Sequence, residues 1–170
     1  MRLLILLLIS IHLKGQSIGV LTYGEVPNRT VLITALQKEI KRVYGKEIIE
    51  IGVVEIPRRA YYKPRYRYIA DMLVNDAARY KGYSSILAIT AKDISTDSPN
   101  WGICGLAGDY SCVVSMYRTK TIPLFVDVAI HEIGHTIGYN HCRDVSCFMQ
   151  EYDGTLRVHK KFCDNHKGAK

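Results

Sequence analysis

The segment from His131 to His141 restricts the possible structure of this chain more than any other feature, because it reads HExxHxxGxxH. On a helix, His131 and His135 lie four residues apart, so both imidazoles leave the same face and can bind one metal ion. Gly138 allows the backbone to leave the helix in a left-handed conformation that a β-carbon would disfavour. The chain can then turn back and bring His141 to the same ion. The pattern therefore predicts a helix, a tight reversal and a three-histidine metal site.

The chemistry of this site follows from its ligands. Three neutral imidazoles leave the fourth position of a zinc ion open for water or substrate, which is typical of catalytic rather than structural zinc. Glu132 points about 100° around the helix from the first histidine, toward the open side of the metal. There its carboxylate can accept a proton from the zinc-activated water and pass it to the leaving amine. We therefore expect a zinc metallopeptidase with Glu132 as the general base.

Two other functions share part of this motif. A catalytically inactive, zinc-stabilised binding module would keep the histidines but would not need Glu132. A zinc amidohydrolase acting on a non-peptide substrate would use the same metal chemistry. The intact glutamate favours an enzyme over a binding module, and a comparison of peptide and small amide substrates would separate the two kinds of enzyme.

The residues after the third histidine carry a family resemblance. Cys142, Cys147 and Met149 extend the motif to HExxHxxGxxHCx₄CxM, and the stretches SIGVLTYGEV, AYYKPRYRYIADMLV and WGICGLAG add to the match. From Ser17 onward the chain resembles the archaemetzincins, a subgroup of the metzincin metallopeptidases. The resemblance implies that residues 17–170 form one archaemetzincin-like metallopeptidase domain.

The resemblance also implies the architecture. We expect a mixed α/β, metzincin-like single compact domain with a twisted, mostly parallel sheet and one antiparallel edge strand. An active-site helix and a Met-turn would complete it, with Met149 as a soft floor beneath the histidines rather than a ligand. The edge strand, expected within Trp101–Ala107, would line the cleft and pair with an extended peptide or protein substrate. Tyr152 and Tyr139 are candidates for the donor that stabilises the oxyanion, by proximity in sequence alone.

A second, structural zinc site is implied by the same resemblance. In the family the cysteines beyond the catalytic histidines bind this zinc, and here they are Cys142, Cys147 and Cys163. The family pattern usually ends in a C-x-x-C pair, whereas this chain has His166 at the last position. Three cysteines and one histidine are an ordinary structural zinc set, and His159 is the alternative fourth donor. We therefore expect two zinc ions per chain; the alternative is that the cysteines are buried thiols or partly disulfide-bonded.

The N-terminal residues have the pattern of a signal peptide. Arg2 supplies a positive charge, and Leu3 to Ile11 is apolar except for Ser10. This run is too short to span a bilayer but suits the hydrophobic region of a signal peptide. We expect residues 1–16 to be removed on export to the periplasm or the medium. The alternative is a buried strand in a cytoplasmic protein.

Cys104 and Cys112 lie outside the expected zinc set, eight residues apart. If the strands around them form a hairpin, an oxidising compartment would permit a disulfide between them. The alternative is a pair of buried free thiols, and the sequence does not favour either.

Hydrophobic periodicity predicts alternating strands and helices, which indicates a parallel sheet with helices packed on it. The expected strands are Ile18–Tyr23, Glu47–Ile56, Ser85–Thr90, Trp101–Gly105 and Cys112–Met116. The expected helices are Thr30–Tyr44, between Asn28 as cap and Gly45 as stop, then Arg67–Tyr80, and then the active-site helix that Pro123 opens. In that last helix the expected core residues are Phe125, Val126, Ala129, Ile130, Ile133 and Ile137.

Composition sets limits on partners. A hydrophobic content of 48% and a charged content of 23% are ordinary for one globular domain. The net charge of +7 and the mixed basic and aromatic segment Arg58–Tyr68 could suit nucleic acid. That segment, however, resembles a scaffold loop of the family. We therefore expect a monomer without a nucleic-acid partner and without stable insertion into a membrane.

Overall fold

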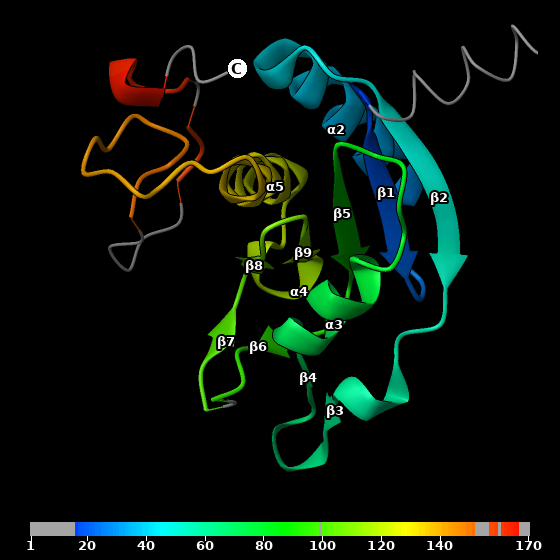
Figure 1. Ribbon diagram of the computed structural model, residues 1–170. Coiled ribbons are helices and arrows are strands. Elements are labelled where there is room, and N and C mark those ends of the chain that lie inside the picture. The colour runs from blue at the N-terminus through cyan, green and yellow to red at the C-terminus, as the bar shows by residue number, and fades with distance from the viewer. Residues whose placement is uncertain (1–15, 99, 152–156, 160, 167–170) are drawn as a thin grey trace, which may run out of the picture.

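The computed structural model describes residues 16–98, 100–151, 157–159 and 161–166 (Figure 1). Apart from Gln16, the predicted signal peptide lies outside the described residues, so it stays a prediction. Tyr152 also lies outside them. Within the described part of the chain, none of the helices combines the length and the apolar character that crossing a membrane requires.

The main sheet has five strands in the order β2-β1-β5-β9-β8. Four of them are parallel, and β8 pairs antiparallel with β9 at one edge. The strands are β1 (Ile18–Tyr23), β2 (Ile48–Val54), β5 (Ser85–Thr90), β8 (Gly105–Ala107) and β9 (Ser111–Ser115). Every residue of β1, β5 and β9 is buried, as expected for parallel strands covered on both faces. The predicted mixed α/β fold with one antiparallel edge strand is confirmed.

Helices cover both faces of this sheet. The helices α2 (Arg29–Tyr44) and α5 (Ile122–Thr136) share one hydrophobic core, which includes Ile18 and Val20 of β1. The helix α3 (Ala70–Ala77) belongs to a second core with Leu21 and Tyr23 of the same strand. Alternate side chains of the strand thus point to opposite layers, as the pleat of a strand requires. The result is a three-layer arrangement with the sheet in the middle (Figure 1).

The first helix follows its predicted boundaries closely. Asn28 is its N-cap in a left-handed conformation, with φ of 53°, although its side chain makes no capping hydrogen bond. Gly45 ends the helix with φ of 66°, and its amide donates to the carbonyl of Lys41. Glycine suits this position because it adopts positive φ without the steric cost of a β-carbon.

Two predicted elements were wrong in detail. The helix expected over Arg67–Tyr80 begins only at Ala70, because Arg67–Ile69 is strand β4. The strand expected over Trp101–Gly105 is divided, since Gly102–Ile103 is β7 of a smaller sheet and Gly105 begins β8. The smaller sheet has the order β3-β4-β6-β7, with β3 at Tyr61–Tyr62 and β6 at Ile94–Ser95.

Ion pairs link segments of the smaller sheet to each other and to the segment around Arg118. Asp93, which is nearly buried, accepts hydrogen bonds from Arg67 Nε at 2.7 Å and from Arg118 Nε at 2.8 Å. These contacts join three segments that are distant in sequence, so local periodicity could not predict them. The remaining elements are short: η1 (Arg58–Ala60), η2 (Lys63–Arg65), α4 (Met116–Thr119) and η3 (Asp164–His166).

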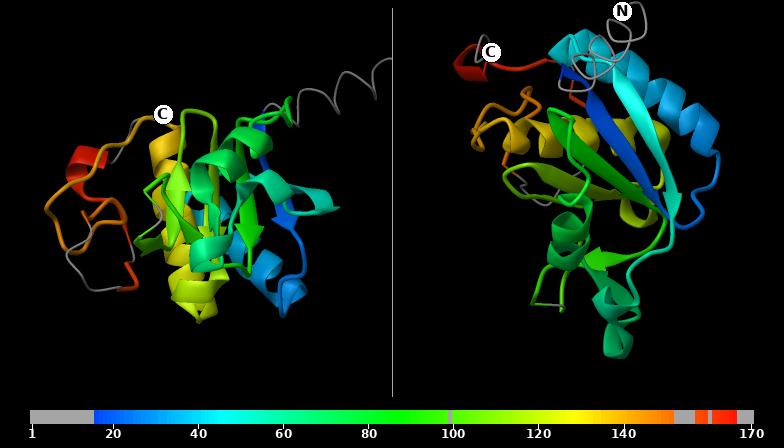
Figure 2. Two further views of the ribbon diagram at one scale, coloured as in Figure 1. Left: turned by 90° about the horizontal axis from the view of Figure 1, so that it is seen from below. Right: turned by 45° about the vertical axis from the view of Figure 1, so that its right-hand side comes forward.

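The segment after α5 has little regular structure among its described residues, which form two isolated bridges and the turn η3. It lies beside α5, away from the β2 edge of the sheet (Figure 2). This placement brings the C-terminal cysteines and histidines close to the residues at the end of α5.

Candidate active site and metal centres

The helix α5 places the first two histidines. Proline lies in its first turn, and the predicted core residues from Phe125 to Ile133 are buried toward the sheet. Ile137 was predicted to be buried with them, but it caps the helix and is 39% exposed. The reason is that the chain reverses immediately after it, at Gly138, with φ of 92°. The left-handed turn predicted at Gly138 is present.

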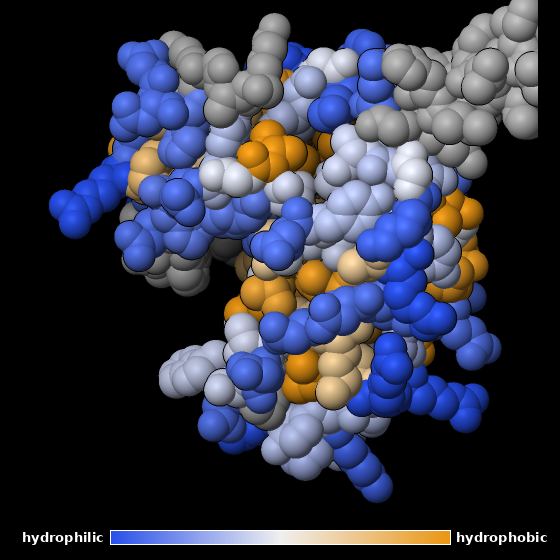
Figure 3. All heavy atoms as spheres, in the orientation of Figure 1, coloured by the Kyte–Doolittle hydropathy of each residue, from blue (hydrophilic) through white to orange (hydrophobic). Residues whose placement is uncertain are grey.

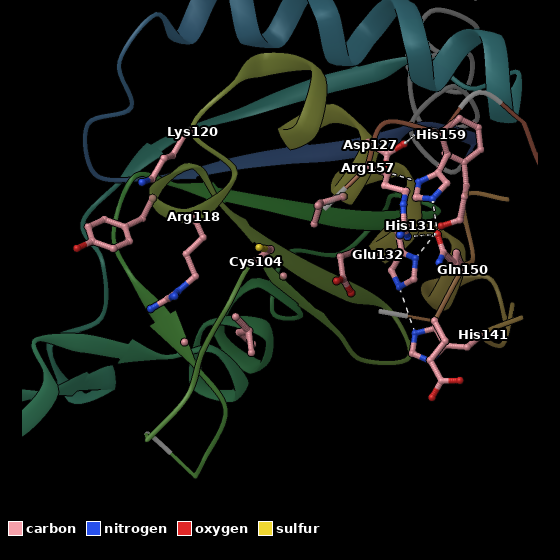
Figure 4. Close-up of a pocket in the computed structure, with 17 residues that line it drawn as sticks. Cys104, Arg118, Lys120, Asp127, His131, Glu132, His141, Gln150, Arg157 and His159 are labelled. Atoms are coloured by element: carbon pink, nitrogen blue, oxygen red, sulfur yellow. Dashed lines mark hydrogen bonds and ion pairs between the residues drawn. The ribbon is translucent and has the colours of Figure 1, made fainter. Parts of the chain in front are cut away.

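The three histidines converge on one point. The Nε2 atom of His135 lies 3.0 Å from that of His131 and 3.1 Å from that of His141, and the remaining pair is 3.2 Å apart. A tetrahedral zinc ion with Zn–N distances of about 2.0–2.1 Å would hold its nitrogens roughly 3.3 Å apart. His131 and His141 face each other across this point (Figure 4). The donor set therefore fits a zinc ion.

Backbone carbonyls set the tautomer of two of these rings. The Nδ1 of His131 donates to the carbonyl of Phe148 at 2.7 Å, and that of His135 donates to the carbonyl of Tyr139 at 2.8 Å. Each Nε2 therefore presents its lone pair to the metal point. Burial lowers the pKa of His131 to about 4 and also lowers the pKa of His135. Both rings are thus kept neutral, which is the form that binds metal.

Glu132 lies between the histidines and the edge strand β8. Its carboxyl packs against the backbone of Gly105, where an added β-carbon would lie 2.7 Å from Oε1. Burial raises the pKa of Glu132 to about 8, and a cation held by the histidines would favour the charged form and lower the pKa again. Because Gly105 has no side chain, there is room for the Glu132 carboxyl against β8.

A cavity of about 580 Å³ opens at this point, lined by His131, Glu132 and His141 together with β7, β8 and the residues around Met149. The molecular surface is hollowed between the C-terminal segment and the strands β7 and β8 (Figure 3). Arg118 and Lys120 line the cavity at a distance from the histidines (Figure 4). A cavity of this size suits part of a peptide chain.

A second cluster of donors lies next to the first. Sγ of Cys142 and Sγ of Cys163 are 3.9 Å apart, and Nδ1 of His166 lies 3.5 Å from Sγ of Cys147 and 3.2 Å from Sγ of Cys163. Zinc–sulfur distances of about 2.3 Å would give sulfur–sulfur separations of roughly 3.8 Å in a tetrahedral site. The four side chains therefore fit a structural zinc, with His166 as the fourth donor.

His159 lies elsewhere, so the alternative that it completes the second cluster was wrong. Its backbone amide and its Nδ1 both donate to the carboxylate of Asp127, at 2.7 and 2.8 Å. Its Nε2 lies 3.0 Å from Oε1 of Gln150, and both side chains line the cavity. This pair was not predicted from the sequence. The available signal was an acidic residue within an apolar helical run, one turn before His131.

The five cysteines are all free thiols, so the alternative of a disulfide between Cys104 and Cys112 was wrong. Cys112 pairs with Ala107 across the β8–β9 ladder, whereas the carbonyl of Cys104 accepts a hydrogen bond from the amide of Ser115. The two cysteines are therefore out of register by several residues, and a disulfide requires much closer Cα atoms.

Of the two tyrosines considered for oxyanion stabilisation, Tyr152 lies outside the described residues, and Tyr139 is not among the residues that line the cavity. The ring of Tyr139 packs against Phe162 and His166, with ring centroids 5.1 and 5.2 Å apart. It contributes to the buried wall of the second cluster instead.

Met149 packs against the active-site helix at Gly134, and its role in a Met-turn stays a prediction. It is fully buried, and a β-carbon added to Gly134 would lie 2.5 Å from its Sδ. The close contact explains why glycine is suited to a position between His131 and His135 on the helix.

We predict that Gly134→Ala destabilises the protein. Helix propensity alone favours alanine by about 1 kcal/mol, whereas overpacking a core costs about 1–3 kcal/mol, so we expect a net loss of up to about 2 kcal/mol. Urea denaturation of the metal-loaded protein would measure it. In a Met149→Ala background the clash is absent, and there the same substitution should be neutral or stabilising. Destabilisation of equal size in both backgrounds would contradict the role assigned to Met149.

Comparison with known proteins agrees with this geometry. No family model matches the chain. The archaemetzincin of Nanoarchaeum equitans is 31% identical over 122 residues, which cover 69% of this chain and 70% of that protein. The archaemetzincin of Haloarcula marismortui is 30% identical over 135 residues, covering 69% of this chain and 77% of the relative. The chain belongs to the archaemetzincin family.

Solved archaemetzincin structures share its fold. The structure from Methanopyrus kandleri has a TM-score of 0.80 and 24% identity, covering 90% of this chain and 92% of that one. The malonate complex from Archaeoglobus fulgidus has a TM-score of 0.76 and 21% identity, covering 90% and 99%. The resemblance to archaemetzincin-like zinc metallopeptidases and the fold expected from it are therefore confirmed.

Proposed function

We propose that this archaemetzincin is a zinc-dependent peptidase in which Glu132 is the general base. The observation that carries the proposal is the position of the Glu132 carboxyl, buried between three converging imidazoles and the edge strand while lining the cavity. A zinc ion bound by His131, His135 and His141 would supply Lewis acidity and a positive charge at the cavity wall.

Glu132 would carry the proton from the water to the leaving group. The Glu132 carboxylate accepts a proton from the attacking water and delivers it to the leaving amine. Its packing against Gly105 limits its rotamers, which keeps the oxygen directed at the cavity. The buried surroundings also strengthen its electrostatic interaction with the reacting atoms.

The edge strand β8 would hold the substrate. It pairs with β9 on one side only, so its other edge can accept an extended peptide as an additional strand. Cys104 and Gly105, which line the cavity, place that edge beside Glu132. This arrangement favours peptides over small amides.

The second cluster would hold a structural zinc through Cys142, Cys147, Cys163 and His166. All four donor positions are protein side chains, three of which are buried, so no position is left for a substrate. We therefore propose two zinc ions per chain, of which one is catalytic.

Metal removal tests the function. We expect purified protein to contain two zinc ions per chain and to cleave members of a mixed peptide library. Dialysis against a chelator should abolish cleavage, and added Zn²⁺ should restore it. Elemental analysis and mass spectrometry of the peptides would provide the measurement. If the fully loaded protein cleaves no peptide, a panel of small amides would show whether it is an amidohydrolase; failure on both panels would favour a binding module.

A further inference from the structure

The two donor clusters are joined through backbone groups. The carbonyl that orients His131 belongs to Phe148, which directly follows the second-cluster residue Cys147. The carbonyl that orients His135 belongs to Tyr139, whose ring packs against His166 of the second cluster. Both outer partners of the catalytic histidines are therefore carried by residues in contact with the second cluster.

The second cluster also holds the peptide units around Phe148. Sγ of Cys147 accepts hydrogen bonds from the amide of Met149 at 3.4 Å and from the amide of Cys163 at 3.2 Å. The amide of Phe148 donates to the carbonyl of Lys161 at 3.0 Å. The Phe148 peptide is thus positioned by groups that a metal at the cysteines would draw together.

The third catalytic histidine depends on the same segment. His141 and Cys142 are consecutive, yet the first belongs to the triad and the second to the cysteine cluster. The amide and carbonyl of Cys142 are hydrogen-bonded to Met149 and Glu151, which places its peptide against the segment around Met149. His131 and His135 are presented by the helix α5, whereas His141 is presented by a segment with little regular structure.

We propose that the metal in the Cys142–Cys147–Cys163–His166 site positions the catalytic histidines and so raises the metal affinity of the triad. The inference rests on the proposed two-metal function but concerns binding rather than turnover. Without the second metal, the segment that carries His141 and the Phe148 and Tyr139 carbonyls loses its main cross-link. Loss of an outer partner of a ligating histidine typically lowers metal affinity by about 10–100-fold. Because coupling between two binding sites is reciprocal, metal in the triad must raise the affinity of the cysteine site by the same factor.

Cobalt binding to the metal-free protein provides the test. Co²⁺ at a site with cysteine ligands gives thiolate charge-transfer absorption, and Co²⁺ at three histidines gives only ligand-field bands, so the two sites can be titrated separately. We expect Cys163→Ser, which leaves two thiolates, to weaken Co²⁺ binding at the cysteine site and to lower the Co²⁺ affinity of the triad by at least about 10-fold. His166→Cys keeps four donors and should retain the wild-type affinity of the triad. Cys112→Ala removes a buried thiol outside both clusters and should have no effect on either site.

The reciprocal variant keeps the proposal testable if Cys163→Ser does not fold. His135→Ala removes a triad ligand and leaves all four donors of the second site. In this variant the Co²⁺ affinity of the cysteine site should fall by the same factor by which the second metal raises the affinity of the triad in the wild type. Unchanged cysteine-site affinity in His135→Ala, or unchanged triad affinity in folded Cys163→Ser, would overturn the proposal. Neither result would bear on peptide hydrolysis, which the chelator experiment tests separately.

Discussion

Replacing Glu132 with glutamine is expected to lower kcat/KM for peptide cleavage by about 10²–10⁴-fold, the usual contribution of a general acid–base group. Glutamine has the same shape and fits against Gly105, but its amide cannot accept a proton from water. The metal ligands are unchanged, so the zinc content should remain that of the wild type. Steady-state kinetics on the best library peptide, together with elemental analysis, would measure both quantities.

The exposed residue Glu25 provides a matched control, because Glu25→Gln removes one negative charge from a residue that does not line the cavity. It should leave kcat/KM unchanged. Full activity in Glu132→Gln would show that another group accepts the proton. A loss of activity accompanied by a loss of zinc would mean that the glutamine has disturbed the metal site, and the general-base role would then have no support from this variant.

Removing the Asp127 carboxylate is expected to produce the largest loss of stability, about 1–3 kcal/mol in the free energy of unfolding, because the nearly buried amide and imidazole of His159 are left without their hydrogen-bond acceptor. Asp127 and His159 have side chains that are 7% and 11% exposed. The carboxylate accepts two hydrogen bonds from His159 and thereby ties the C-terminal segment to α5. Asp127→Ala would release that tie, and denaturant unfolding of the metal-loaded protein would measure the loss.

A double-mutant cycle would isolate this interaction from other effects of the substitution. Asp127→Ala, His159→Ala and the double variant should give a coupling energy of about 0.5–3 kcal/mol, typical of residues in direct contact. Asp97→Ala changes an exposed carboxylate and should alter stability by less than about 0.5 kcal/mol. Strictly additive effects of the two single variants would show that the pair does not stabilise the C-terminal segment.

The sequence was most informative where the chemistry is local. His131, Glu132 and His135 lie within five consecutive positions of one helix, so helical geometry alone predicts how the side chains point. The strands Ile18–Tyr23 and Ser85–Thr90 were predicted with the boundaries that the structure has, because short apolar runs between turn residues are a strong strand signal. The glycine turn that brings in His141 is likewise a property of a few neighbouring residues.

Only the tertiary structure decided which distant residues meet. His159 and His166 have the same chemistry, and both lie close to Cys163 in sequence, yet one contacts Asp127 and the other contacts the cysteines. Asp93 contacts Arg67 and Arg118 from two other segments, and Arg67, which was predicted to lie in a helix, lies in strand β4, which pairs with β6. Local periodicity carries no information on such pairings, because their free energy comes from contacts that exist only once the chain is folded.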